Sequence, residues 1–218
     1  MLNDDGGMQA LRALGARSVP IVSRGDRYVF AQVIKDVVDF LQLDDDTTPE
    51  LSPAQLAERY DHVLDTAIRL VRQMPDERLA DELPDRPRSW RVLMHHVFQI
   101  PTAFLDMEEN GGELTYEALT VPPPEALKSS ADIARFGETV RQRFADWWAS
   151  VKDQDFTGQV PTYFGGTTRH EMMERTVWHS TQHTRQVAAL LEQAGVTPDR
   201  PLTPADIKGL PLTDKVWG

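Results

Sequence analysis

The 218-residue chain contains no cysteine, and this absence excludes several kinds of chemistry. Disulfide bonds, thiolate metal ligands and cysteine nucleophiles all require a cysteine side chain, so this chain forms none of them. Any thiol that takes part in its chemistry must therefore come from another molecule.

Two further absences narrow the class of partner. No apolar run approaches the roughly 18 residues of a membrane-spanning helix, and residues 1–7 lack the basic and apolar regions of a signal peptide. The chain has 23 Lys and Arg against 34 Asp and Glu, a net charge of -11, whereas proteins that bind the phosphate backbone carry clustered Lys and Arg. We therefore expect a cytoplasmic protein that binds neither nucleic acid nor a membrane and acts on a small-molecule substrate.

The most informative stretch begins at Thr168. Thr168 and Glu171 have the spacing of a capping box, no Pro or Gly follows, and the pattern stops at Gly195, so the sequence predicts one long helix. Because a helix has about 3.6 residues per turn, His179 and His183 lie one turn apart on one face. Such a pair can supply two ligands to one metal ion, although pairs at this spacing also occur on helices that bind no metal.

A third ligand would turn this pair into a metal site, and the adjacent His95 and His96 are the candidates. They lie in a predicted helix that begins at Ser89 and has an apolar stripe that includes Val97. His96 lies on the side of the stripe, whereas His95 is displaced by about a hundred degrees around the helix. His96 is therefore the preferred ligand, with His95 as the alternative. Pro101 is expected to kink or interrupt this helix.

Four stretches of the chain have apolar residues at intervals of three and four, which is typical of amphipathic helices. Two long connections separate the second, third and fourth of them. This pattern predicts a four-helix bundle, in which metal sites are built from inward side chains on facing helices. The predicted helices span about 52–73, 89–109, 130–151 and 168–194, and Ser52 and Gln55 have the capping-box spacing at the start of the first.

In such a bundle, His96, His179 and His183 would form a set of three neutral imidazole ligands with at least one open position. This composition suits Zn, and also Ni, Fe or Mn. A divalent cation with neutral ligands keeps its positive charge and so stabilises a bound thiolate or hydroxide near neutral pH. The three histidines therefore predict a reactive metal centre.

Residues 1–42 predict a small α+β unit in front of the bundle. Two strands, 18–23 and 28–31, are joined by a short turn, and an amphipathic helix follows them. Residues 43–51 are acidic and contain Pro, so we expect a linker there. The bundle with its extended C-terminal tail then occupies residues 52–218.

Within this first unit, the run Ser18-Val19-Pro20-Ile21-Val22, followed by Gly25-Asp26-Arg27, resembles the C-terminal half of a glutaredoxin or thioredoxin-like domain. The resemblance implies a cis peptide bond before Pro20, beside a thiol-binding groove. The first half of that fold and its Cys-x-x-Cys motif are absent, so the unit is no disulfide reductase. The alternatives are a truncated half-domain used for packing or dimer contacts and a retained thiol-binding role. Exposed strand edges in residues 18–31 favour a homodimer.

A His on the second helix, followed on the last helix by His-x-x-x-His-x-Arg-Gln, resembles the DinB/YfiT-like superfamily of metal-binding four-helix bundles. The resemblance covers residues 52–213 and implies a mainly α fold, a DinB-like bundle with a small N-terminal α+β appendage. The resemblance implies that His96, His179 and His183 are metal ligands, and Gln186 also matches the pattern of the superfamily. The family often has Arg-Gly-Gln after the last of these histidines, and this chain has Thr-Arg-Gln instead.

Members of this superfamily include transferases and isomerases that use mycothiol, bacillithiol or glutathione. The resemblance therefore implies a metal-dependent transferase that activates a low-molecular-weight thiol. The alternatives are a metal-dependent hydrolase and a non-catalytic metal-binding stress or assembly protein. Arg185 is the candidate for binding a carboxylate of a cofactor or substrate, with a surface ion pair as its alternative role.

Overall fold

The structure is a computed structural model, and it describes residues 5–16, 21–31, 33–83 and 86–217. The chain divides into two compact units, residues 1–48 and residues 49–218. Among the described residues, no helix is both long enough and apolar enough to cross a membrane.

The described residues of the first unit form one antiparallel strand pair and two helices. The strands pair in register from Ile21↔Phe30 to Arg24↔Arg27, and Gly25 in their turn has a left-handed φ of 66°. The described residues of this unit show no thioredoxin-like segment, and the cis bond predicted before Pro20 lies outside them. In chain order the elements are α1 (Asp5–Ala13), β1 (Ile21–Arg24), β2 (Arg27–Phe30) and α2 (Ile34–Leu41).

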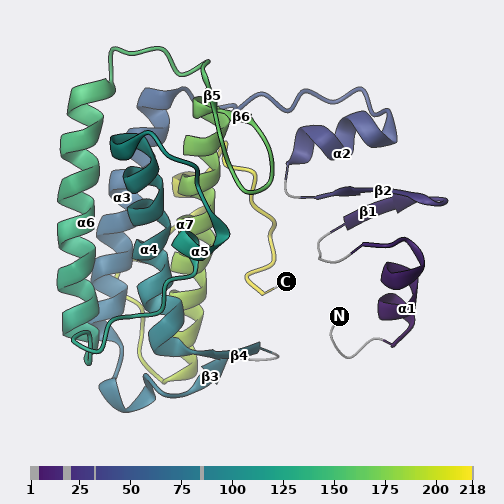
Figure 1. The fold of residues 1–218 in the computed structure, drawn as a ribbon. Helices are drawn as coiled ribbons and strands as arrows, with labels where there is room; N and C mark the ends of the chain where they lie inside the picture. Colours follow the sequence, from purple (N-terminus) through teal and green to yellow (C-terminus); the bar gives the residue numbers. More distant parts are fainter. Residues whose placement is uncertain (1–4, 17–20, 32, 84–85, 218) are drawn as a thin grey trace. The chain divides into compact units, whose positions relative to one another are not determined.

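The second unit is a bundle of four long helices, which confirms the predicted fold (Figure 1). They are α3 (Pro53–Gln73), α4 (Trp90–Asn110), α6 (Ser130–Val151) and α7 (Arg169–Gln193). Both α3 and α4 pack against α6 and against α7, so the apolar stripes of all four helices meet in one core.

Short elements occupy the connections of the bundle. The connection from α3 to α4 holds a 3-10 helix and a strand pair, and a second strand pair comes just before α7. The bounds are η1 (Asp76–Arg78), β3 (Glu82–Leu83), β4 (Arg86–Ser89), α5 (Tyr116–Leu119), β5 (Gln159–Val160), β6 (Thr167–Thr168) and α8 (Pro204–Ile207).

The capping boxes predicted from the sequence at the starts of α3 and α7 form their hydrogen bonds in the structure. At α7, Thr168 Oγ1 accepts from the Glu171 backbone N–H at 3.2 Å, and the Glu171 carboxylate accepts from the Thr168 backbone N–H at 2.7 Å. Ser52 and Gln55 form the equivalent pair at α3. Because these reciprocal bonds satisfy N–H groups that have no partner within the helix, they fix where α3 and α7 begin.

Pro101 does not interrupt α4, which continues through it to Asn110. Proline has no N–H, so the Val97 carbonyl one turn earlier lacks its usual helical donor. Ser180 of α7 supplies the missing donor, because its hydroxyl lies 3.0 Å from the Val97 oxygen. The Tyr60 hydroxyl of α3 lies 2.9 Å from the same Ser180 oxygen. The predicted interruption is therefore wrong, because a hydrogen bond from α7 satisfies the Val97 carbonyl, whereas the predicted kink stays a prediction.

A largely buried ion pair joins three helices near the C-terminal end of α4. Arg169, the first residue of α7, donates from Nε to the Glu108 carboxylate at 2.9 Å, and the two side chains are 15% and 4% exposed. Trp147 of α6 donates to the same carboxylate at 3.3 Å, and the Arg169 guanidinium lies 4.4 Å from the centre of the Phe156 ring. These contacts fix the start of α7 against α4 and α6.

Candidate metal centre

Three histidines from two helices converge inside the bundle. His96 comes from α4, and His179 and His183 come from consecutive turns of α7. One ring nitrogen from each lies within 4.8 Å of one ring nitrogen of the other two. The ring centroids are 5.4 Å apart for His96 and His179, 5.0 Å for His96 and His183, and 4.9 Å for His179 and His183.

The neighbouring histidine has a different environment. His95 is buried and stacks on Phe136 of α6, with ring centroids 5.3 Å apart and an angle of 15° between the rings. The structure therefore brings His96, and not His95, to the pair on α7.

The hydrogen bonds around Ser180 hold the two helices together at this level. Ser180 follows His179 directly, and Val97 follows His96 directly. The hydrogen bond from Ser180 to the Val97 carbonyl therefore links the two backbones beside the histidines that they carry. The unusual proline in α4 thus contributes to the relative position of the candidate ligands.

Burial keeps two of the three histidines, His96 and His179, neutral. His96 and His183 are 6% and 8% exposed. The pKa of His96 is lowered to about 2, mainly by burial and also by the His183 imidazole and the Arg88 guanidinium. Burial also lowers the pKa of His179 well below its usual value, helped by His183 and His96 and then by Arg175 and Arg88. Neutral imidazoles present the lone pairs that a metal ion requires.

Contacts behind two of the histidines orient their rings. Nδ1 of His183 lies 2.7 Å from Oε1 of Gln186, and His96 forms a hydrogen bond with the backbone of Leu119. Gln99, one turn after His96, donates to the Ala118 carbonyl at 2.8 Å and so holds α5 against α4. Hydrogen bonds of this kind commonly fix the orientation of metal-binding histidines.

Two arginines and several aromatic side chains surround the site, and the sequence analysis assigned them no role. Arg175 lies one turn before His179, forms a hydrogen bond with Tyr163, and lies 4.5 Å and 5.6 Å from the ring centres of Phe164 and Trp178. Its spacing of four residues from His179 is the sequence signal that could have placed it there. Arg88, on β4, has no comparable periodic signal.

Arg185 interacts with the tail of its own chain. Its guanidinium donates to the carbonyls of Thr213 and Asp214 at 2.8 and 2.9 Å and to the Gln182 side chain at 2.8 Å. The predicted contact between Arg185 and a cofactor stays a prediction, and the structure shows a different set of partners.

The three histidines fit a divalent metal ion. Zn–N bonds are about 2.0–2.1 Å long, so nitrogens around one tetrahedral ion lie roughly 3.3 Å apart. The candidate donor atoms lie within 4.8 Å of one another before any adjustment, and His96 and His183 are buried while His179 is half-buried. Three ligands leave a fourth tetrahedral position available for another molecule.

Comparison with known proteins identifies the fold. A scan against protein-family models matches the DinB family over residues 46–207. The chain belongs to the DinB family. A three-histidine group inside a DinB bundle fits a metal-binding protein.

Among solved structures, this DinB chain is similar to a DinB-like protein from Bacillus cereus ATCC 10987. The TM-score is 0.53 at 19% identity, and the match covers 70% of this chain and 99% of that one. At this identity, the similarity supports the fold alone. No curated protein matches the chain.

Proposed function

We propose that this DinB protein is a metal-dependent transferase that activates a low-molecular-weight thiol and adds it to a small electrophilic substrate. The observation that supports this function most strongly is the convergence of His96, His179 and His183, of which the first and last are buried and His179 is half-buried. We favour Zn as the metal, with Ni, Fe and Mn as alternatives.

A divalent ion at these histidines would supply Lewis acidity, lowering the pKa of a thiol or water at its open position. Residues of the chain would supply positive charge and apolar surface around this open position. The guanidinium groups of Arg88 and Arg175 lie close enough to lower the pKa of His179, and the same positive charge favours an anionic thiolate over a neutral thiol. Phe164 and Trp178, beside Arg175, offer apolar surface to the substrate.

The chain has no cysteine, so the thiol is a second substrate. Turnover should therefore depend on added thiol. The test is the rate of substitution of an activated aryl chloride with glutathione, mycothiol or bacillithiol and without thiol, in zinc-loaded wild type and in His183→Ala. His62→Gln is the matched control, because His62 is an exposed histidine of α3 outside the site.

We expect thiol-dependent turnover in the wild type and in His62→Gln, and loss of it in His183→Ala. Metal-dependent turnover that proceeds equally well without thiol would replace the transferase by a hydrolase. A zinc-loaded protein without turnover on any substrate tried would favour a non-catalytic metal-binding protein.

We also propose that the N-terminal unit joins two copies of the chain. Phe30, Ile34 and Leu43 of this unit are 41%, 61% and 52% exposed, and the two-stranded sheet of β1 and β2 leaves one edge of each strand unpaired among the described residues. A homodimer would cover them. Light scattering that gives the mass of a single chain would contradict this proposal.

A further inference from the structure

Residues 213–216, near the end of the chain, are held against α7 by three side chains from one face of that helix. Gln182, Arg185 and Gln186 donate hydrogen bonds to four consecutive carbonyls of this segment. The bonds are Arg185 Nη1 to Thr213 O (2.8 Å), Arg185 Nη2 to Asp214 O (2.9 Å), Gln182 Nε2 to Lys215 O (3.2 Å) and to Val216 O (2.8 Å), and Gln186 Nε2 to Val216 O (3.0 Å).

One of these side chains also contacts a candidate metal ligand. Gln186 donates from Nε2 to the Val216 carbonyl, and its Oε1 lies 2.7 Å from Nδ1 of His183. A continuous path of two hydrogen bonds therefore runs from the tail through Gln186 to His183.

The direction of these hydrogen bonds follows from donor and acceptor chemistry alone. A backbone carbonyl can only accept, so the NH₂ group of Gln186 must face Val216. Its carbonyl oxygen then faces His183 and can only accept, so Nδ1 of His183 must carry the proton. In a neutral His183 ring, Nε2 then carries the lone pair, which is the form that can bind a metal through Nε2.

We propose that residues 213–216 form a positioning element of the metal site. The Val216 carbonyl orients the Gln186 amide, and Gln186 fixes both the tautomer and the ring orientation of His183. This inference rests on the metal site proposed above. Arg185 has a role in it as well, because its two bonds to the tail hold the segment that ends at Val216.

Removing the segment would leave the Gln186 amide without the contact that distinguishes its two ends. The amide could then rotate and present its NH₂ group to His183, which stabilises the tautomer with the proton on Nε2 and the lone pair on Nδ1. Ligand orientation by such outer partners is typically worth about 10–100-fold in metal affinity. We expect a loss of this size when the segment is removed.

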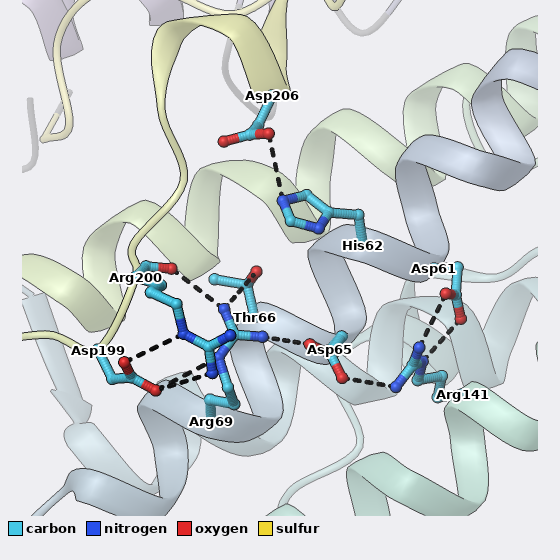
Figure 2. Close-up of polar contacts among 9 residues, drawn as sticks. All are labelled: Asp61, His62, Asp65, Thr66, Arg69, Arg141, Asp199, Arg200 and Asp206. Atoms are coloured by element: carbon cyan, nitrogen blue, oxygen red, sulfur yellow. Dashed lines mark hydrogen bonds and ion pairs between the residues drawn. The ribbon is translucent and has the colours of Figure 1, made fainter.

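The earlier part of the tail is held separately, on α3, which makes a selective truncation feasible. Arg69 donates to the Arg200 carbonyl at 3.1 Å and lies near Asp199, and His62 lies 3.2 Å from Asp206 (Figure 2). Leu210 is buried in the core. A chain that ends at residue 212 therefore keeps these anchors and loses residues 213–218, which include the segment that contacts Gln186.

The experiment measures zinc affinity by competition with a chromophoric chelator, and the His183 tautomer by long-range 1H–15N correlation in metal-free protein. We expect the chain ending at residue 212 to bind zinc about 10–100-fold more weakly than wild type and to show a mixture of His183 tautomers. Gln186→Leu should cause a similar loss, and adding the truncation to it should cost little more, because both changes break the same path.

A rescue variant distinguishes positioning from general stability. In the truncated chain, Gln186→Glu presents an acceptor oxygen to His183 whichever way it rotates, so it should restore the Nδ1–H tautomer and most of the zinc affinity. His62→Gln, which disturbs only the earlier part of the tail, is the matched control and should leave both readouts unchanged. Should the shortened chain fail to fold, Arg185→Ala in the full chain tests the same step, with a smaller expected loss.

An unchanged zinc affinity and an unchanged His183 tautomer in the truncated chain would overturn the inference while leaving the metal site intact. A wild type that binds no metal would instead overturn the proposed function. The tautomer of His183 in wild type and truncated chain would still decide whether the tail acts through Gln186.

Discussion

Replacing Ser180 by alanine removes one hydroxyl and leaves two buried polar groups without their partner. Ser180 and Tyr60 are fully buried, and the Ser180 hydroxyl lies 2.9 Å from that of Tyr60 and 3.0 Å from the Val97 carbonyl. That carbonyl has no helical donor, because Pro101 lies one turn later. Each buried polar group that loses its partner costs about 1–3 kcal/mol, so we expect Ser180→Ala, which leaves two of them, to lower the free energy of unfolding by about 2–6 kcal/mol.

Combining Ser180→Ala with either of two other substitutions tests this explanation further. In the wild type, Tyr60→Phe removes one hydrogen bond and should cost about 1 kcal/mol, but in Ser180→Ala it removes an unpartnered hydroxyl and should recover about 1 kcal/mol. Pro101→Ala should also partly rescue Ser180→Ala, because it supplies an N–H to the Val97 carbonyl.

The assay is urea unfolding of the metal-free protein, followed by circular dichroism, with free energies from linear extrapolation. Metal-free protein is used so that metal binding makes no contribution to the measured free energy of unfolding. A Ser180→Ala variant within about 0.5 kcal/mol of wild type, the usual range for inconsequential surface changes, would refute this explanation of how α4 tolerates its proline.

Two further predictions concern charged groups. Glu108→Ala leaves Arg169 without its largely buried partner and should cost about 3–5 kcal/mol in urea unfolding, whereas Glu108→Gln should cost less because its amide oxygen still accepts hydrogen bonds. Burial, with Glu171 and Glu50 nearby, raises the pKa of Glu174 from 4.5 to about 7. Folding therefore takes up a proton between these pH values, and the contribution of Glu174 to stability falls as pH rises through them. Glu174→Gln should accordingly gain about 1–2 kcal/mol over wild type above that window and little below it, and an equal difference at pH 4 and pH 8 would contradict this.

The sequence predicted those parts of the fold that depend on local patterns. The caps at Ser52 and Thr168 are visible because a capping box spans only four residues, and the side of the helix on which His96 lies follows from helical periodicity. The bundle itself follows from four apolar stripes.

What the sequence could not predict depends on contacts between distant residues. From the sequence, Pro101 predicts a break or kink in the helix. The hydroxyl that replaces the missing helical donor belongs to Ser180, 83 positions from the Val97 carbonyl that accepts it, so no local pattern indicates it. The partners that Arg185 has in the structure could not be predicted, because the carbonyls that it binds belong to a tail with no regular pattern. The role inferred for Val216 rests on its backbone oxygen, which no side-chain motif can indicate.

The most direct test of the central claim is the metal content of protein purified without a chelating tag, measured by elemental analysis beside His183→Ala and His62→Gln. The three-histidine site predicts close to one divalent ion per chain in the wild type and in His62→Gln, and almost none in His183→Ala. A wild type that holds no metal after incubation with Zn, Ni, Fe and Mn would contradict the site, as would a His183→Ala variant that holds as much metal as the wild type.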